Sequence, residues 1–585
     1  MNRRIGKTNI IFYDIIFTGL IFLAILGYLM HWAPYRLEFK EQIGIFLLGA
    51  DRIGWYLLNP AVVASIAGDW LTQFYINGRM GAMLSVLLLA AGWLGLFRFV
   101  RLSENDTRMS GLILTVPMLV EACFLTYLNY PVSATVGLVI SIWMACGLVK
   151  IKNPKLSQWV YLAAVPAAFV IAGGHALTMA LLLGMAGRRE WKQLCALIVG
   201  IIIMTVCGRF YNLTLNQTLL WPFCQGYVGP SWLLSFAQPW IILTSAVLSV
   251  IMGRIRSMGL IIGLYTFILG LSLGVFRLSV KSELESIVKM GTLAYHEQWK
   301  EVKVQAQKNL SDRYAAFYYN LCNAREGRLA DDLLKGRWAL PDGVLFLSTG
   351  RGDPYLSMIY FTDALLEMGD VSQATDCALL AQTIMPGHYS TRMLRRLAQI
   401  AVVTADYDVA RKYLDILMRT RNHRAWARDL LESIESDNIP EQYLIWRSRT
   451  APKDRFFAQG DIRSSLAIIA QECPDNKVAI DYLLCSNLLE KKLNTFVGLY
   501  DKYYLNSLDR IVVVPDLYQE ALLVNVNSRE SLIETARKYN LSQDVVDKYI
   551  HFMDTRSADP NVLIDEARGT YWHYLMAVKL NNNQQ

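Results

Sequence analysis

Apolar residues are distributed very unequally along the chain. Residues 1–280 contain long apolar stretches with few charges, whereas residues 281–585 mix apolar and polar positions as soluble proteins do. Stretches of about 17–25 apolar residues are long enough to cross a bilayer as helices. The pattern predicts nine membrane-spanning helices, the short sixth forming a hairpin with the fifth at Gly173–Gly174. These are residues 9–31, 80–100, 110–128, 133–150, 157–174, 175–188, 193–209, 239–254 and 258–279.

Basic residues in the short loops indicate how the predicted spans are oriented. Lys and Arg precede the first span and follow each even-numbered one, at Arg98, Arg101, Lys150, Lys152 and Arg188 among others. Cytoplasmic loops carry an excess of such residues. We therefore expect an inner-membrane protein with a cytoplasmic N-terminus. Its long outer loops are residues 32–79 and 210–238, and residues 281–585 form a periplasmic domain.

Residues 281–585 show helical periodicity, with apolar residues at steps of three and four. Aligning Ala374 with Ala410 gives a repeat of 36 residues, and each copy is preceded by a small residue and an acid, Gly369-Asp370 and Ala405-Asp406. This is similar to tetratricopeptide helix pairs, whose period is about 34 residues. The predicted fold class is therefore all-α: a polytopic membrane domain followed by a tetratricopeptide-like helical solenoid. An irregular helical bundle is the alternative.

Composition narrows the class of protein. Hydrophobic residues make up 54% of the 585 residues and charged residues 18%, which excludes a disordered chain and a secreted disulfide scaffold. The net charge of +8 needs no nucleic acid as its explanation, because much of the excess lies in the cytoplasmic loops. Nine cysteines without tight spacing indicate no metal site, although a Cys473–Cys485 bridge stays open. The nucleotide-binding and zinc-protease motifs are absent.

The first outer loop, residues 32–79, is too polar to span the membrane and too aromatic for a free loop. Helices lying in the membrane interface fit this pattern and would hold acids at the membrane surface. A carboxylate there can act as a general base or hold a divalent cation such as Mg²⁺ or Mn²⁺. We rank Glu41 first and Asp69 second as catalytic acids, with Asp51 as a further candidate. Glu38 and Glu41 would share a helix face and form a weak metal pair.

Several motifs support a resemblance to an uncharacterised family of Bacteroidota polytopic membrane proteins with a C-terminal helical-repeat domain. In loop one they are Glu41-Gln42, Asn59-Pro60-Ala61 and Trp70-Leu71-Thr72-Gln73-Phe74, and Ala61-Val62 stands where the family has two glycines. In the second half they are Arg396-Leu397-Ala398, Ala405-Asp406-Tyr407-Asp408-Val409-Ala410 and Asn476-Lys477-Val478-Ala479. The resemblance covers most of the chain but implies no established activity.

The overall plan also resembles that of membrane glycosyltransferases of the GT-C type, which use polyprenyl-phosphate sugar donors. The shared features are a cytoplasmic N-terminus, many spans, a long acidic first outer loop and a helical domain on the outer side. The resemblance implies a catalytic acid in loop one. Loop one lacks the Asp-x-Asp or Glu-x-Asp pair that many such enzymes carry.

Four residues in or beside the predicted spans are further candidates. Glu121 lies in the middle of the third span, where an acid has a function or a buried structural partner. His175, Arg209 and Arg277 lie at the outer ends of spans. They could bind the phosphate of a lipid-linked donor, the two arginines through bidentate contacts. The alternatives are a hydrogen-bonded His175 and arginines that extend to the membrane surface.

The leading hypothesis is a polyprenyl-phosphate-dependent glycosyl- or oligosaccharyltransferase on the periplasmic face of the inner membrane. Its partners would be a lipid-linked sugar and a protein or glycan acceptor held by the helical domain. The alternative is a non-enzymatic envelope assembly factor that recruits partners through that domain. A transporter is the third hypothesis, disfavoured because the spans show no clear inverted repeat.

Overall fold

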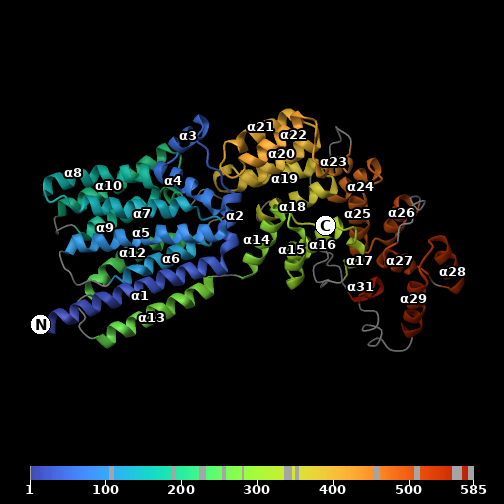
Figure 1. Ribbon diagram of the computed structural model, residues 1–585, viewed down its shortest axis with the longest axis horizontal. Helices are drawn as coiled ribbons and strands as arrows, with labels where there is room; N and C mark the ends of the chain where they lie inside the picture. The colour runs from blue at the N-terminus through green and yellow to red at the C-terminus, as the bar shows by residue number, and fades with distance from the viewer. Residues whose placement is uncertain are drawn as a thin grey trace. The chain divides into compact units, whose positions relative to one another are not determined.

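The computed structural model is all-α, as predicted, with no strand in the part of the chain that it describes. That part comprises residues 2–104, 111–186, 191–222, 232–252, 258–279, 282–334, 345–348, 355–451, 461–505, 514–526, 528–556 and 569–577. Contacts divide the chain into two units (Figure 1). Unit 1 contains residues 1–289, 382–394 and 416–427, and unit 2 contains residues 290–381, 395–415 and 428–585. Two segments from the predicted second domain thus belong to unit 1.

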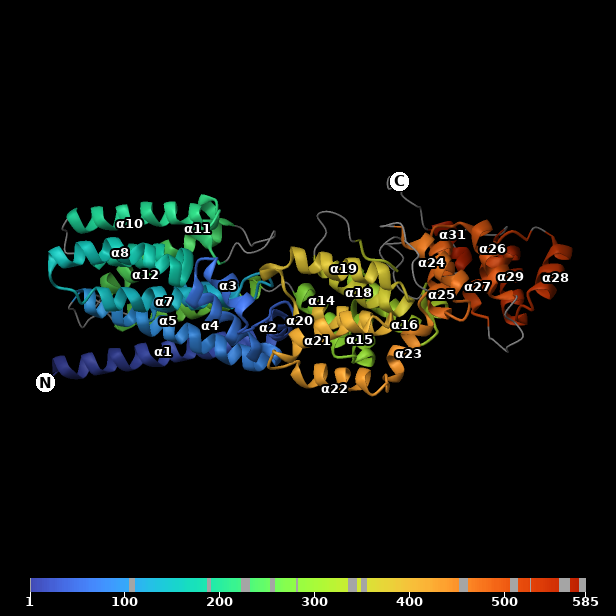
Figure 2. The same ribbon diagram turned by 90° about the horizontal axis from the view of Figure 1, so that it is seen from above.

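The long helices of unit 1 lie alongside one another in both ribbon views (Figures 1 and 2). Their apolar side chains form one continuous buried core. These helices are α1 (Asn2–Trp32), α5 (Gly78–Glu104), α6 (Val116–Leu125), α7 (Val132–Leu148), α8 (Pro154–Ala172), α9 (Ala176–Ala186), α10 (Trp191–Phe210), α12 (Trp232–Met252) and α13 (Met258–Ser279). Shorter elements join them: η2 (Ile113–Thr115), η3 (Gly173–His175) and α11 (Leu215–Leu220).

Four helical stretches of unit 1 are long and apolar enough to cross a membrane, consistent with the expected membrane protein. They are Ile15–Trp32, Gly78–Ser103, Pro154–Ala186 and Trp191–Phe210, and the third of them covers the predicted fifth and sixth spans. The predicted third, fourth and eighth spans appear as shorter apolar helices, Ile113–Leu125, Val132–Leu148 and Ala237–Ile251. The predicted ninth span coincides with α13. Nine crossings therefore stay a prediction.

Small residues allow the helices of unit 1 to pack closely. A Cβ atom built on Gly68 would lie 2.4 Å from Cα of Ser133, at the start of α7. One built on Gly137, also in α7, would lie 2.5 Å from the carbonyl oxygen of Ala172 at the end of α8. Carbon atoms in contact normally lie about 3.5–4.0 Å apart, so neither position accepts a larger residue without movement. Gly68 belongs to loop one, and its close contact fixes that loop against the helices.

The second half of the chain continues as short helices. They are α14 (Ser282–Tyr295), α15 (Trp299–Ala306), η4 (Gln307–Asn309), α16 (Arg313–Arg325), α17 (Leu329–Asp332), α18 (Tyr355–Met368), α19 (Val371–Ile384), η6 (Pro386–His388), α20 (Thr391–Val403), α21 (Tyr407–Met418), α22 (Arg424–Glu435), α23 (Glu441–Ser448), α24 (Ile462–Glu472), α25 (Lys477–Leu489), α26 (Leu493–Tyr503), α27 (Asp516–Leu523), α28 (Arg529–Lys538), α29 (Gln543–Arg556) and α31 (Tyr571–Ala577).

The turns at the predicted repeat positions share one geometry. Gly369 and Ala405 both have a positive φ, 86° and 60°. After each, the amide of the acid donates to a carbonyl five residues back, Asp370 to Leu365 at 2.9 Å and Asp406 to Ala401 at 2.8 Å. These bonds close the helix C-terminus in a Schellman motif, which favours a small residue at the left-handed position. The repeated small-acid pair is therefore a helix-ending signal; the tetratricopeptide-like solenoid itself stays a prediction.

Two motifs that support the family resemblance have structural contacts in unit 2. Nε of Arg396 donates to Asp363 at 2.8 Å, and both side chains are buried. The side-chain oxygen of Asn476 caps α25, and its Nδ2 donates to the carbonyls of Met368 and Arg449, both at 2.9 Å. These polar groups satisfy one another inside the fold, so their occurrence in a motif requires no catalytic role. Cys473 and Cys485, left open above as a bridge, are free thiols.

Candidate functional site

Loop one folds into three short helices and a 3₁₀ turn. They are α2 (Pro34–Gln42), α3 (Ala50–Leu57), α4 (Val62–Thr72) and η1 (Gln73–Ile76). Large apolar side chains of this loop stay exposed: Leu48 at 70%, Leu57 at 62% and Leu58 at 76%. Exposed apolar side chains beside membrane helices are what helices lying in a membrane interface present. These exposed side chains support the predicted interfacial loop, whose place in a membrane interface stays a prediction.

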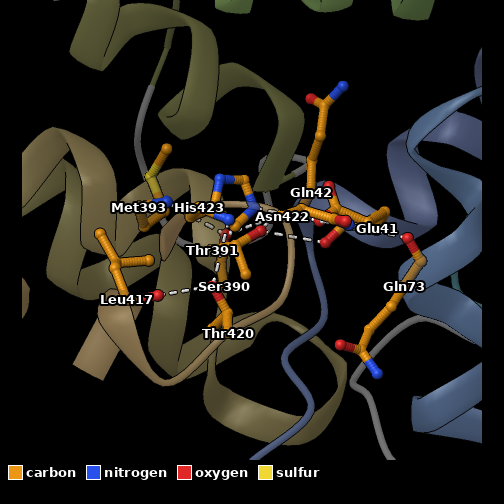
Figure 3. Close-up of polar contacts among 10 residues, drawn as sticks. All are labelled: Glu41, Gln42, Gln73, Ser390, Thr391, Met393, Leu417, Thr420, Asn422 and His423. Carbon is orange, nitrogen blue, oxygen red and sulfur yellow. Dashed lines mark hydrogen bonds and ion pairs between the residues drawn. The ribbon is translucent and has the colours of Figure 1, made fainter. Parts of the chain in front are cut away.

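Glu41, the first-ranked catalytic acid, is held by protein groups (Figure 3). It lies near the end of α2 with 5% of its surface exposed. One carboxylate oxygen, Oε1, accepts from Nδ2 of Asn422 at 3.0 Å and lies 3.0 Å from Nε2 of His423. Asn422 also donates to the backbone carbonyl of Gln73 at 2.7 Å, so it connects α2 to η1. This arrangement identifies Glu41 first of all as an anchor within unit 1.

The segment 390–393 strengthens that anchor, as Figure 3 shows. The Ser390 hydroxyl donates to the carbonyl of Gln42 at 2.8 Å, and the Thr391 hydroxyl donates to the carbonyl of Glu41 at 3.0 Å. The buried Arg392 donates through Nη1 to the side-chain oxygen of Gln42 at 3.0 Å. The end of α2 is thus fastened through both its backbone and its side chains.

Asp69, on α4, has a different environment. Its Oδ2 accepts from the hydroxyl of Tyr56 at 2.7 Å and lies 3.5 Å from Nη2 of Arg52. The side chain keeps 30% of its surface exposed. Desolvation by the surrounding protein raises the pKa of Asp69, and the contacts with Tyr56 and Arg52 oppose that rise. A partly exposed carboxylate whose pKa is raised is a stronger base than an ordinary aspartate, as a general base requires.

Two adjoining hollows meet at Asp69. The Glu41 hollow, lined by Glu41, Asp69, Arg421 and Asn422 among others, has an empty volume of about 340 Å³. The Arg52 hollow, lined by Lys40, Arg52, Trp55, Asp69 and Tyr389 among others, has an empty volume of about 620 Å³ up to its opening to solvent. Glu41 and Asp69 therefore share a hollow, and Asp69 alone of the two reaches the larger one.

Lys40 connects the Arg52 hollow to the interior of the helix bundle. Its Nζ donates to the carbonyl of Tyr127 at 2.7 Å and to that of Tyr130. Burial lowers the pKa of Lys40 to about 7. The Tyr130 hydroxyl in turn donates to Glu121 at 2.6 Å.

Glu121, the predicted acid inside a span, is fully buried in α6. It accepts from Tyr130 and from the Thr135 hydroxyl, each at 2.6 Å, and from the amide of Gln238 on α12. Three donors from separate segments satisfy the carboxylate, which offsets much of the cost of burying it. Glu121 therefore joins α6, α7 and α12 through one shared hydrogen-bond centre.

The predicted phosphate-binding residues lie elsewhere. Arg209 ends α10 and Arg277 lies in the last turn of α13, both exposed, and His175 lies in η3. None of the three lines either hollow. The side chain of Asp51 lies outside the described residues. Glu38 is half-buried on α2. Among the residues described, no group of three or more His, Cys, Asp or Glu side chains could hold a metal ion, so the Glu38–Glu41 pair gains no further ligand.

Comparison with known proteins gives one match. A family model described as "Family of unknown function (DUF6057)" matches residues 9–578. The chain belongs to this family. No curated protein matches the chain, and no solved structure matches it either. Membership of DUF6057 covers both halves of the chain and leaves the activity to be argued from the site.

The structure adds functional candidates that the sequence did not single out. Arg52 and Tyr56 contact Asp69, and Arg52 and Lys40 line the larger hollow. His423 and Asn422 contact Glu41. Arg52 and Tyr56 lie four residues apart on one short helix, which is a signal that helical spacing could have given. His423 lies 382 residues from Glu41 in the chain, and no local pattern indicates that contact.

Proposed function

We propose that this DUF6057 protein is a transferase that moves a sugar from a polyprenyl-phosphate-linked donor to a hydroxyl acceptor at the periplasmic face of the inner membrane. The observation that carries the proposal is the position of Asp69. Its partly exposed carboxylate lines two adjoining hollows. Other residues of loop one expose apolar side chains, as membrane-interface helices do. A lipid-linked donor would enter such a site from the membrane surface.

In the proposed reaction Asp69 acts as the general base. Its carboxylate takes the proton of the acceptor hydroxyl while the acceptor oxygen forms a bond to the anomeric carbon of the sugar. The bond from that carbon to the donor phosphate oxygen breaks, and the polyprenyl phosphate leaves with the bonding electrons. The Tyr56 hydroxyl, which donates to Asp69 at 2.7 Å, orients the carboxylate. This mechanism uses no metal ion.

The proposal includes the topology expected from the sequence: nine spans, a cytoplasmic N-terminus and a periplasmic second half. The distribution of basic residues in the short loops supports it. The second half would act as a tetratricopeptide-like surface that presents a protein or glycan acceptor. The Schellman turns at Gly369 and Ala405 support helix pairing in that half.

The test replaces Asp69 by Asn in the full chain and compares the envelope glycans of complemented deletion cells by mass spectrometry. Asp408→Asn is a matched control, because the Asp408 side chain is 92% exposed and contacts only Arg411 on its own helix. We expect Asp69→Asn to reproduce the glycan profile of the deletion at normal protein level, and Asp408→Asn to restore the wild-type profile. A wild-type profile with Asp69→Asn would overturn the proposed function.

A second candidate function is a non-enzymatic assembly factor of the envelope. The burial of Glu41 among Asn422 and His423 favours it, because the first-ranked acid serves to hold loop one in place. An assembly factor requires the fold of the full chain but no free carboxylate. Normal envelope assembly with Asp69→Asn, together with its loss when Glu41 is replaced by Ala, would support this function over the transferase.

A further inference from the structure

Arg52 carries unused hydrogen-bond donors at the wall of the larger hollow. It is 8% exposed, and its Nε and Nη1 atoms have no hydrogen-bond partner in the part of the chain that is described. Among the described residues, Nη2 of Arg52 lies 3.5 Å from the Asp69 carboxylate. A buried donor without an acceptor costs about 1–3 kcal/mol, and more on a charged group. Such a group at the wall of a hollow that opens to solvent indicates an acceptor that comes from outside the chain.

Aromatic rings hold the guanidinium of Arg52 in place. It lies 4.1 Å from the ring centroid of Trp55, 5.2 Å from that of Tyr56 and 5.4 Å from that of Tyr389. Cation–π contacts of this kind stabilise the positive charge but supply no acceptor for its N–H groups. The side chain is therefore oriented in advance, with its charge kept and its donors unused.

Lys40 adds a second positive charge to the same hollow. Its ammonium group donates to the carbonyls of Tyr127 and Tyr130, which account for two of its three protons. Burial lowers its pKa to about 7, so an anion nearby would favour the charged form of Lys40. Asp69 is the acid that shares the hollow with these two cations, and burial raises its pKa. The balance of charge in the hollow favours an anion.

We propose that the Arg52 hollow binds an oxyanion of the phosphate class through the guanidinium of Arg52 and the ammonium of Lys40. Arginine is well suited to this ligand, because its planar fork matches two oxygens of one phosphate. The inference rests on the proposed function in one respect, that the anion comes from a lipid-linked donor. It assigns the phosphate to Arg52 and Lys40 in place of Arg209 and Arg277.

The experiment measures binding by calorimetry to the full-length protein in phosphatidylcholine nanodiscs. One arm titrates inorganic phosphate, and the other compares nanodiscs with and without a long-chain polyprenyl monophosphate. Binding of free phosphate alone would indicate a soluble ligand. Preferential binding of the prenyl phosphate would indicate a lipid headgroup. For whichever phosphate source binds the wild type, we expect Arg52→Gln to weaken binding about 10–100-fold. This is the loss expected for charged hydrogen bonds. The affinity of Arg52→Lys should lie between that of Arg52→Gln and that of the wild type.

Arg79→Gln is the matched control, because Arg79 is an exposed cation of the same loop that lines neither hollow. Its affinity should equal that of the wild type. If Arg52→Gln does not fold, Arg52→Lys and Lys40→Met provide the test. The inference is overturned if folded variants of both cations bind as the wild type does, if neither phosphate source binds the wild type, or if Arg209→Gln causes the loss instead.

Asp69→Asn separates this inference from the proposed function. The variant should keep phosphate binding, since it removes a negative charge beside Arg52, while losing the glycan product. Phosphate binding together with an unchanged glycan profile in Asp69→Asn cells would leave the anion site standing and refute the transferase. Absence of binding together with a lost glycan product would refute the anion site alone.

Discussion

The close approach of α4 to α7 can be tested by adding one methyl group. In Gly68→Ala the new Cβ would lie 2.4–2.6 Å from Cα, N and Cβ of Ser133, at least about 1 Å closer than carbon atoms pack. Two of these three atoms belong to the backbone, so no side-chain rotation relieves the overlap. Overpacking costs about 1–3 kcal/mol, and this contact belongs at the upper end. Alanine is about 1 kcal/mol more favourable than glycine inside a helix, which leaves a net loss of about 2 kcal/mol in the free energy of unfolding.

The assay is thermal unfolding of the protein in nanodiscs at a fixed heating rate. A loss of about 2 kcal/mol corresponds to a midpoint lower by about 3 °C, because a unit of roughly 300 residues has an unfolding entropy of about 0.6 kcal/mol/K. The control is Gly54→Ala on α3 of the same loop, where an added Cβ meets no atom within 4 Å. That variant should unfold at or above the wild-type temperature. A midpoint for Gly68→Ala equal to that of Gly54→Ala would refute the close packing of α4 on α7, and with it the placement of the neighbouring Asp69.

Two further predictions concern Glu41 and Lys40. Glu41→Gln should lower the free energy of unfolding by about 1 kcal/mol, because an amide oxygen can replace Oε1 as acceptor. Glu41→Ala leaves Asn422 and His423 without an acceptor and should lower it by about 3 kcal/mol. Equal unfolding midpoints for the two variants would contradict the anchoring role. Binding of sulfate, an oxyanion whose charge does not change near neutral pH, should weaken up to about tenfold from pH 6 to pH 8, since Lys40 loses its proton near pH 7. Calorimetry on Lys40→Met isolates the lysine contribution, and an unchanged pH dependence of sulfate binding in that variant would refute it.

Local pattern determined the helical class of this protein and several of its turns. Runs of apolar residues predicted α1, α5 and α10, because a bilayer-length helix is specified by consecutive residues. The small-acid pairs at Gly369 and Ala405 predicted helix breaks where both residues adopt a left-handed conformation. The aromatic and acidic composition of residues 32–79 predicted an interfacial loop, and its short helices expose apolar side chains as expected.

The tertiary structure alone decided what each acid does. Glu41 and Asp69 looked alike in the sequence, and Glu41 was ranked first. In the fold Glu41 is held by Asn422 and His423, more than 380 residues along the chain, while Asp69 lies at the larger hollow. Arg209 and Arg277 were matched to a phosphate by their sidedness, yet the hollow is lined by Arg52 and Lys40. Helical periodicity depends on residues that are close in the sequence. Burial and side-chain contacts depend on which distant segments pack together, and residue spacing does not predict that packing.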